Sequence, residues 1–346
     1  MAVAHQALED KIDRTGESMM SKEKKPTVAI CYDFDGTLSP LYMQEYGFFL
    51  GLPKKEREGF WNRSNATAKA NGADPILQYM KLMVDETKAY TGTARATREA
   101  FRDYGKNVQF FKGVEKWFKR IKKYAKTKGV IVEHYIISSG LKEMVEGTSI
   151  GKFFKQIYAC SFIYENGIAS WPAQVVNFTT KTQYLFRINK GEEDISSSEV
   201  VNSFIEQEKR PVPFHNMIYI GDGETDVPCM RVVKAQGGHS IAVYNPRKKR
   251  SKEIAEKLYA EGRVNYVIQA DYSEGRLLDR IIKSIIDKVA AQSRLDCVSL
   301  KAIPQANNEP EMPKDKGVTC DDVQDHTEHV DALPTSQGES SVLKRD

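Results

Sequence analysis

Short, continuously apolar runs alternate along the chain with longer stretches in which apolar residues recur every three or four positions. The short runs predict buried strands, because turn residues bound them and they are rich in valine, isoleucine and tyrosine. Six runs have this character: 26–33, 130–139, 156–167, 216–223, 239–244 and 264–270. The third ends in the turn residues Glu165, Asn166 and Gly167, which predict that its strand enters a hairpin.

The periodic stretches predict helices. Residues 114–128 place apolar side chains at 114, 117, 118, 121 and 124, which is the spacing of one helix face. The other predicted helical stretches are 40–108 with breaks at 51–53 and 71–75, 181–189, and 273–290 with a serine cap at its start. Continuously apolar strands separated by helices predict an α/β fold with a doubly wound parallel sheet, Rossmann-like and covered on both faces.

Both ends of the chain differ from this middle part. Residues 1–25 are polar without a sustained period, and residues 291–346 are rich in Pro, Asn, Ser, Gln and acidic residues. Segments of this kind bury too little apolar surface to offset the entropy of ordering them. Both are therefore predicted to be disordered, the second as an acidic tail.

The composition is that of a globular protein: of 346 residues, 40% are hydrophobic and 28% are charged. No run of about 18 apolar residues predicts a membrane span, and the first residues lack the apolar segment of a secretory signal. The five cysteines show no metal-binding spacing. We therefore expect reduced thiols, a cytoplasmic protein and no membrane partner.

The net charge of +4 is unevenly distributed, because acidic residues outnumber basic ones beyond residue 290. Basic clusters at 119–128 and 247–250 are predicted to be solvated helix faces and a loop. Neither cluster comes with a nucleic-acid-binding motif or with interleaved aromatic residues, so no nucleic-acid partner is expected.

Polar residues gather where the predicted strands end. The first strand is followed by Asp33 and Asp35, the second by Ser138–Gly140, and a later one by Asp222 and Asp226 of GDGETD. Ligands of a parallel sheet bind beyond the carboxyl ends of its strands. These groups are therefore predicted to meet in one crevice.

The carboxylates of Asp33 and Asp35 would repel each other without a compensating positive charge. Oxygen ligands suit a divalent cation, and Mg²⁺ is the ion expected here. Lys181, which opens a predicted helix, would add a second positive centre. A metal and a lysine among acids are also what a transferring phosphoryl group needs, because its charge is spread over several oxygens.

The remaining phosphate oxygens would be held by the hydroxyl of Ser138 and by the backbone N–H groups of Ser139 and Gly140 at a helix start. One of the two aspartates after the first strand would attack phosphorus as a nucleophile, and the other would act as a general acid and base.

Taken singly, these motifs have simpler interpretations. D-x-D-G and GDG also occur in plain turns, a serine after a strand is usually a helix cap, and a lone lysine is most often solvated. A calcium loop is disfavoured, because the glycine stands fourth rather than sixth and Gln44 occupies the twelfth position. Only the ordered combination points to one chemistry.

That combination resembles the haloacid dehalogenase-like (HAD) hydrolase superfamily over roughly residues 27–290. The motifs are DFDGTL at 33–38, the strand-end serine of YIISSG, the lysine of KTQYLFRIN and GDGETD at 221–226. The resemblance implies that Asp33 forms an aspartyl-phosphate. It also implies that Asp35 protonates the leaving alcohol and then activates the water that hydrolyses the intermediate.

The resemblance further implies a metal site. Mg²⁺ would be held by Asp33, Asp222 and the main-chain carbonyl of Asp35. Asp226 would support the metal shell through water or Lys181, and Lys181 would neutralise Asp33 and the phosphate. Ser138 would bind the phosphoryl group, with Ser139 as the alternative.

The helical stretch 42–106 is similar to the cap that closes over the site in this family, which leaves 26–41 and 107–290 as the core. The layout is similar to that of phosphoserine phosphatase-type members, although Tyr42 stands where that group has a substrate-binding acid. Five residues could line the cap side of the site but are each expected to be structural: Tyr42, Glu45, Trp61, Arg63 and Arg102.

The predicted function is a Mg²⁺-dependent phosphomonoester phosphatase that acts on a small phosphorylated metabolite through an aspartyl-phosphate. Two alternatives stay open: a phosphotransferase or phosphomutase with the same intermediate, and a non-catalytic binding module that keeps the fold. The residues do not name the substrate, the oligomeric state or the role of the acidic tail.

Overall fold

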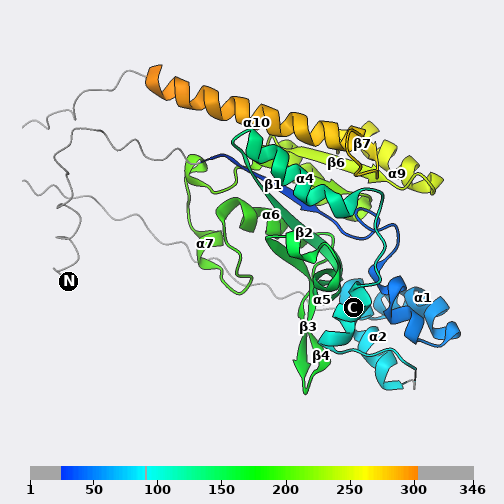
Figure 1. Cartoon of the computed structure of the whole chain (residues 1–346). Coiled ribbons are helices and arrows are strands. Elements are labelled where there is room, and N and C mark those ends of the chain that lie inside the picture. The colour runs from blue at the N-terminus through cyan, green and yellow to red at the C-terminus, as the bar shows by residue number, and fades with distance from the viewer. Residues whose placement is uncertain (1–24, 90–91, 303–346) are drawn as a thin grey trace, which may run out of the picture. The chain divides into compact units, whose positions relative to one another are not determined.

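The computed structural model describes residues 25–89 and 92–302, and its central element is a seven-stranded sheet with the order β4-β3-β2-β1-β5-β6-β7 (Figure 1). Neighbouring strands are parallel except for β4, which pairs antiparallel with β3. The strands are β1 (Thr27–Tyr32), β2 (Ile131–Leu141), β3 (Gln156–Glu165), β4 (Ile168–Gln174), β5 (Met217–Gly221), β6 (His239–Tyr244) and β7 (Tyr266–Gln269). The predicted sheet and hairpin are thus confirmed.

Helices connect these strands. In the described part of the chain the α-helices are α1 (Lys54–Asn71), α2 (Pro75–Ala89), α3 (Arg98–Gly105), α4 (Val114–Thr127), α5 (Lys142–Gly147), α6 (Lys181–Lys190), α7 (Glu199–Asn202), α8 (Val227–Ala235), α9 (Lys249–Ala260) and α10 (Leu277–Ala302). The short 3₁₀ turns are η1 (Met43–Tyr46), η2 (Phe48–Gly51), η3 (Gly151–Phe153), η4 (Gln207–Lys209), η5 (Phe214–Asn216) and η6 (Glu224–Asp226). None of the helices described combines the length and the apolar character that a membrane crossing requires.

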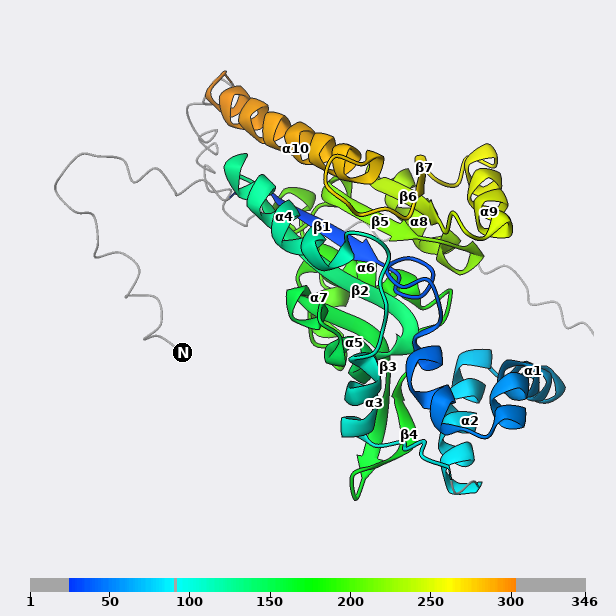
Figure 2. The ribbon, with the colours of Figure 1, turned by 45° about the vertical axis from the view of Figure 1, so that its right-hand side comes forward.

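The central strands β1 and β5 are covered on both faces. Their side chains alternate between the faces, yet every residue of β5 and all but the first of β1 are buried. Helices α4 and α10 lie side by side along the sheet, as Figures 1 and 2 show, and Arg120 of α4 forms an ion pair with Asp279 of α10 at 3.0 Å. The doubly wound α/β core therefore has the layered form that the apolar runs predict.

The segment between β1 and α4 is helical, as predicted, and its own core is aromatic: Phe48, Phe49, Phe60 and Phe101 are buried there. Helix α2 begins where the carboxylate of Asp74 accepts from the N–H groups of Ile76 and Leu77. The same helix reaches the end of β2, since the Tyr79 hydroxyl donates to the Ser139 carbonyl at 2.6 Å. These helices therefore lie over the carboxyl ends of the strands.

The C-terminal helix differs from its prediction. It begins at Leu277 rather than at the serine of 273 and continues to Ala302, so residues 291–302 are helical and not part of a disordered tail. Gly275 has a positive φ of 76° and stands outside the helix. Beyond residue 290 the sequence is polar but keeps good helix formers, which extend a helix that already exists. Residues 1–24 and 303–346, also predicted to be disordered, lie outside the described residues.

The end of β2 also differs from its prediction. The strand runs through Gly140 to Leu141, where Leu141 pairs with Cys160 of β3, and α5 begins only at Lys142. The backbone N–H groups of Ser139 and Gly140 are therefore not at a helix start. Pairing with β3 keeps the chain extended past the point where the polar residues alone predict a turn.

Candidate active site

Asp33 and Asp222 lie at the same edge of the sheet because they follow neighbouring strands. Asp33 directly follows β1 and Asp222 directly follows β5, and the Asp33 N–H donates to the carbonyl of Ile220 at 2.9 Å. After β1 the chain continues to β2, toward one edge of the sheet, and after β5 it continues to β6, toward the other edge. A crevice opens between the carboxyl ends of two neighbouring strands that are connected in this way. One carboxylate oxygen each of Asp33, Asp222 and Asp226 lies within 4.8 Å of the others.

Lys181 supplies the positive charge within this cluster. It is the first residue of α6 and is buried, and its Nζ donates to Asp33 Oδ1 at 2.9 Å and to Asp226 Oδ1 at 2.7 Å. Burial opposes its charge, but the carboxylates of Asp226 and Asp33 outweigh burial and raise the pKa of Lys181. The ammonium of Lys181 therefore stays charged over the pH range in which proteins are folded.

Lys181 does not fully compensate the negative charge of the clustered carboxylates. Burial raises the pKa of Asp33, although Lys181 opposes the change, and the charge of Asp226 adds to it. Burial and the charges of Asp226 and Asp33 likewise raise the pKa of Asp222 well above its usual range. Closely spaced hard oxygen donors with too little compensation fit a divalent cation such as Mg²⁺.

Asp35 has a different environment from Asp33. Its Oδ1 accepts the backbone N–H of Met43, at the start of η1, at 2.9 Å, and its side chain is not one of the three clustered carboxylates. Burial, followed by the charge of Asp33, raises the pKa of Asp35 well above its usual range. A carboxyl group whose pKa is raised has the property a general acid needs.

Two glycines leave room for the carboxylates of the acidic loops. Gly36 has a φ of +80°, and a Cβ placed on it would lie 2.2 Å from Oδ2 of Asp222. A Cβ on Gly221 would lie 2.4 Å from Oδ2 of Asp226. Gly36 is thus required by the contact between the DFDGTL and GDGETD loops, and Gly221 by the packing of Asp226 within GDGETD.

Asp226 is held by protein groups on both oxygens. Besides Lys181, its Oδ1 accepts from the Tyr219 hydroxyl at 2.8 Å, and its Oδ2 accepts from the Asp222 N–H at 3.2 Å. The side chain is fully buried. Although it belongs to the acidic cluster, its contacts make it the residue that positions Lys181 and Asp222.

The two serines of YIISSG have different surroundings. Ser138 is buried, and its Oγ accepts the N–H of Gly140 at 3.1 Å. Ser139 is half-buried and uses its carbonyl oxygen to accept from Tyr79 and from the Cys160 thiol. All three residues of Ser138–Gly140 line the same cavity as Asp33 and Asp222.

This cavity has a volume of about 850 Å³ and lies between the strand ends and the helical segment 42–106. Tyr42, Glu45 and Trp61 line it, and the rings of Tyr42 and Trp61 lie 5.3 Å apart. Arg63 and Arg102 do not line it; Arg63 pairs with Glu86 and Arg102 with Glu146. Three of the five cap residues weighed from the sequence thus border the site.

The sequence reasoning missed three residues that build the site: Met43, Tyr79 and Tyr219. Each contributes one hydrogen-bond donor: the Met43 N–H donates to Asp35, the Tyr79 hydroxyl to Ser139 and the Tyr219 hydroxyl to Asp226. Tyr219 lies on β5 two positions before Gly221, so its polar group within an apolar run was the one available signal. The other two belong to the helical segment, whose packing no local pattern reveals.

Comparison with known families identifies the chain. Residues 30–231, more than half of its length, match the family model of the haloacid dehalogenase-like hydrolases. The chain belongs to this family. The match begins within β1 and ends within α8, so it contains all four motifs and the carboxylate cluster of this HAD-family hydrolase.

This HAD-family hydrolase is also similar to individual proteins. It is 30% identical over 284 residues to an uncharacterized protein of Borreliella burgdorferi, which covers 74% of this chain and 95% of that relative. A solved substrate-bound phosphoserine phosphatase is 17% identical with a TM-score of 0.46, over 75% of this chain and 99% of that one. Cytosolic 5'-nucleotidase IIIB bound to cytidine is 14% identical with a TM-score of 0.44, over 78% and 88%.

Proposed function

We propose that this HAD-family hydrolase is a Mg²⁺-dependent phosphatase that hydrolyses a small phosphomonoester through an aspartyl-phosphate on Asp33. The observation that carries this proposal is the position of the Asp33 carboxylate. It follows a buried strand, faces the cavity, and is held by the Lys181 ammonium at 2.9 Å within the cluster that contains Asp222.

In the first step an oxygen of Asp33 attacks phosphorus, and the bond between phosphorus and the alcohol oxygen breaks. The departing oxygen takes a proton from Asp35, whose pKa is raised by burial and by the charge of Asp33. Oδ1 of Asp33 is bound to Lys181, so Oδ2 is the oxygen assigned to the attack.

In the second step water attacks phosphorus, its proton passes to Asp35, and the bond between Asp33 and phosphorus breaks to release inorganic phosphate. Asp33 and Asp35 return to their starting states, so the cycle balances without another reactant. Lys181 neutralises Asp33 in the resting enzyme and the phosphate oxygens during transfer.

The residues proposed to hold Mg²⁺ are Asp33, Asp222 and the main-chain carbonyl of Asp35. The ion would supply charge stabilisation to the phosphoryl oxygens. Asp226 would hold Lys181 and the Asp222 backbone in place rather than bind the ion. Ser138, Ser139 and Gly140 would contact the phosphoryl group, with the Ser138 hydroxyl first because it is already fixed by the Gly140 N–H.

A cavity of about 850 Å³ suits a substrate of metabolite size. We propose such a small phosphorylated molecule as the partner of this site, without nucleic acid or membrane. A reducing, cytoplasmic setting is consistent with the buried free thiols of Cys31, Cys160 and Cys229.

The test is phosphate release from an aryl phosphate and from a panel of sugar phosphates, nucleotides, phosphoamino acids and lipid headgroup phosphates, with Mg²⁺ present. Release by the wild-type chain that Asp33→Asn abolishes would support the proposal. Transfer of the phosphoryl group to an added alcohol faster than to water would favour a phosphotransferase. No release above the Asp33→Asn level on any substrate would favour a non-catalytic module.

A further inference from the structure

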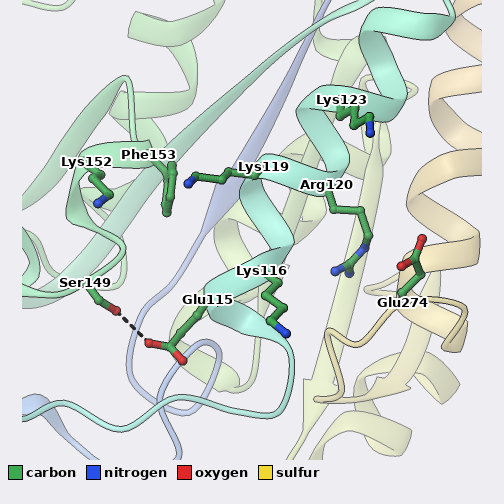
Figure 3. Close-up of a pocket in the computed structure, with 9 residues that line it drawn as sticks. All are labelled: Glu115, Lys116, Lys119, Arg120, Lys123, Ser149, Lys152, Phe153 and Glu274. Carbon is green, nitrogen blue, oxygen red and sulfur yellow. Dashed lines mark hydrogen bonds between the residues drawn. The ribbon is translucent and has the colours of Figure 1, made fainter.

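A groove of about 670 Å³ lies between α4 and the segment around η3, and it shares no lining residue with the cavity of Asp33. Figure 3 shows that most of the side chains lining it are basic. Lys116, Lys119 and Lys123 come from α4, three and four positions apart, so they share one helix face. Lys152 reaches the groove from η3, on the opposite side.

These four lysines are exposed and, among the residues that the structure describes, none of them forms an ion pair with a carboxylate. Elsewhere on the surface many lysines do form one, as Lys81 does with Asp85 and Lys257 with Glu261. A groove that collects unneutralised ammonium groups from two separate segments has the charge arrangement of an anion site.

The other charged residues of the groove are engaged within the protein. Arg120 donates to Asp279 at 3.0 Å and to the carbonyl of Tyr272 at 2.6 Å. Glu115 accepts from the Ser149 hydroxyl at 3.1 Å, and Glu274 lies 3.9 Å from Lys283. The four lysines are therefore the groups that remain available to a ligand.

Phe153 lies between two of these lysines. The ammonium groups of Lys119 and Lys152 each lie 5.7 Å from the centre of its ring, and Figure 3 shows them on either side of it. The ring itself is fixed, because it stacks on Phe118 at 5.5 Å and its backbone carbonyl accepts from Lys122. Two ammonium groups on either side of one fixed ring can contact separate anionic groups of a single ligand.

We propose that this groove binds a compact organic polyphosphate, the ammonium groups contacting several phosphates at once. A volume of about 670 Å³ is that of a small-molecule site. The carboxylates of Glu115 and Glu274 border the basic area and would repel the backbone of a longer polyanion. Phe153 is the one aromatic ring among the residues that line the groove, whereas single-stranded nucleic acids are bound by several stacking rings.

The experiment is calorimetric titration of the full chain with inositol hexakisphosphate and with ATP, in chelator and at moderate salt. Both probes should bind, and affinity should fall as salt rises. Removing two ammonium groups in Lys119→Gln/Lys152→Gln should weaken binding about tenfold or more, or about 1.4 kcal/mol. Lys119→Arg/Lys152→Arg, which keeps the charges, should retain most of the affinity.

Lys126→Gln is the matched control, because Lys126 is an exposed lysine of α4 that does not line the groove. It should leave the affinity within about twofold, since surface changes away from a site have small effects. Asp33→Asn should also leave it unchanged, which separates this site from the proposed phosphatase activity. The proposal is overturned if neither probe binds at millimolar concentration, or if Lys119→Gln/Lys152→Gln binds them as tightly as the wild type. It is also overturned if DNA oligomers or anionic vesicles, titrated in the same way, bind and the two probes do not.

Discussion

The ammonium of Lys181 lies 2.9 Å from Oδ1 of Asp33, although 148 residues separate the two along the chain. Both side chains are buried, so each would be costly without the other. This pair, extended to Asp226, means that the acidic cluster is partly compensated by the protein itself. What remains uncompensated is negative charge, which a divalent cation would offset.

Replacing the ammonium should therefore cost both stability and activity. Lys181→Met leaves Asp33 and Asp226 without their buried partner, and we expect a loss of about 3–5 kcal/mol in the free energy of unfolding. Urea denaturation at neutral pH measures it. Lys126→Met, at an exposed position of α4, should change stability by less than about 0.5 kcal/mol. A loss below about 1 kcal/mol in Lys181→Met would mean that the pair contributes little.

Asp35→Asn tests the acid–base assignment. The amide keeps the size of the side chain and can accept the Met43 N–H, so the fold should survive. Turnover should fall by about 10²–10⁴-fold, the usual contribution of general acid–base catalysis. Steady-state kinetics give the rate, and Mg²⁺ titration should give an affinity close to that of the wild type. Unchanged turnover would remove Asp35 from this role.

Gly36→Ala tests the close approach of the two acidic loops. The new Cβ would lie 2.2 Å from Asp222 Oδ2 and would displace that carboxylate, so Mg²⁺ affinity should fall about 10–100-fold. Gly262→Ala is the control: its φ is +69°, but nothing lies within 4 Å of an added Cβ. It should show only backbone strain of about 1–2 kcal/mol and normal Mg²⁺ affinity. Equal Mg²⁺ affinities in the two variants would argue against the contact.

Removal of divalent metal should abolish phosphate release, and added Mg²⁺ should restore it, because the clustered carboxylates otherwise repel the incoming phosphate. Ca²⁺, which prefers more ligands at longer distances, should restore less activity. The measurement is initial rate against free metal concentration. Full activity in excess chelator would contradict the interpretation of the cluster as a metal site.

A buried histidine should make the fold sensitive to acid. His134 lies within the core beside Phe118, and burial lowers its pKa to about 3. Because Trp117 donates to the Tyr32 oxygen, the Tyr32 proton is available to Nδ1 of a neutral His134.

Between pH 6.5 and 3 the unfolded chain binds a proton at this position and the folded chain does not. The stabilisation from a neutral His134 is thus complete above about pH 6.5 and falls by about 1.4 kcal/mol per unit below it. His134→Gln should flatten the dependence of unfolding free energy on pH between 6.5 and 4.5, while His215→Gln, at an exposed position, should not. Identical slopes in wild type and His134→Gln would exclude this contribution.

The sequence by itself determined the strands, the α/β class and the acidic motifs at the strand ends. Continuous apolar runs specify buried parallel strands, and the residues that follow them are forced to the same edge of the sheet. Asp33, Asp35 and Asp222 could be assigned to one crevice on this basis. Lys181 was assigned to the same crevice as the first residue of a predicted helix, and the family resemblance added its role of neutralising Asp33 and the phosphate.

Only the tertiary structure decided how the groups divide their roles. The contact of Asp226 with Lys181, the end of β2 at Leu141 and the meeting of Lys152 with the lysines of α4 all join segments distant in sequence. Local propensity and periodicity act over one or two helical turns, whereas these contacts depend on how strands and helices pack. The lysines of the basic cluster on α4 are exposed, as predicted for a solvated helix face, and packing alone decides that they form one side of a groove.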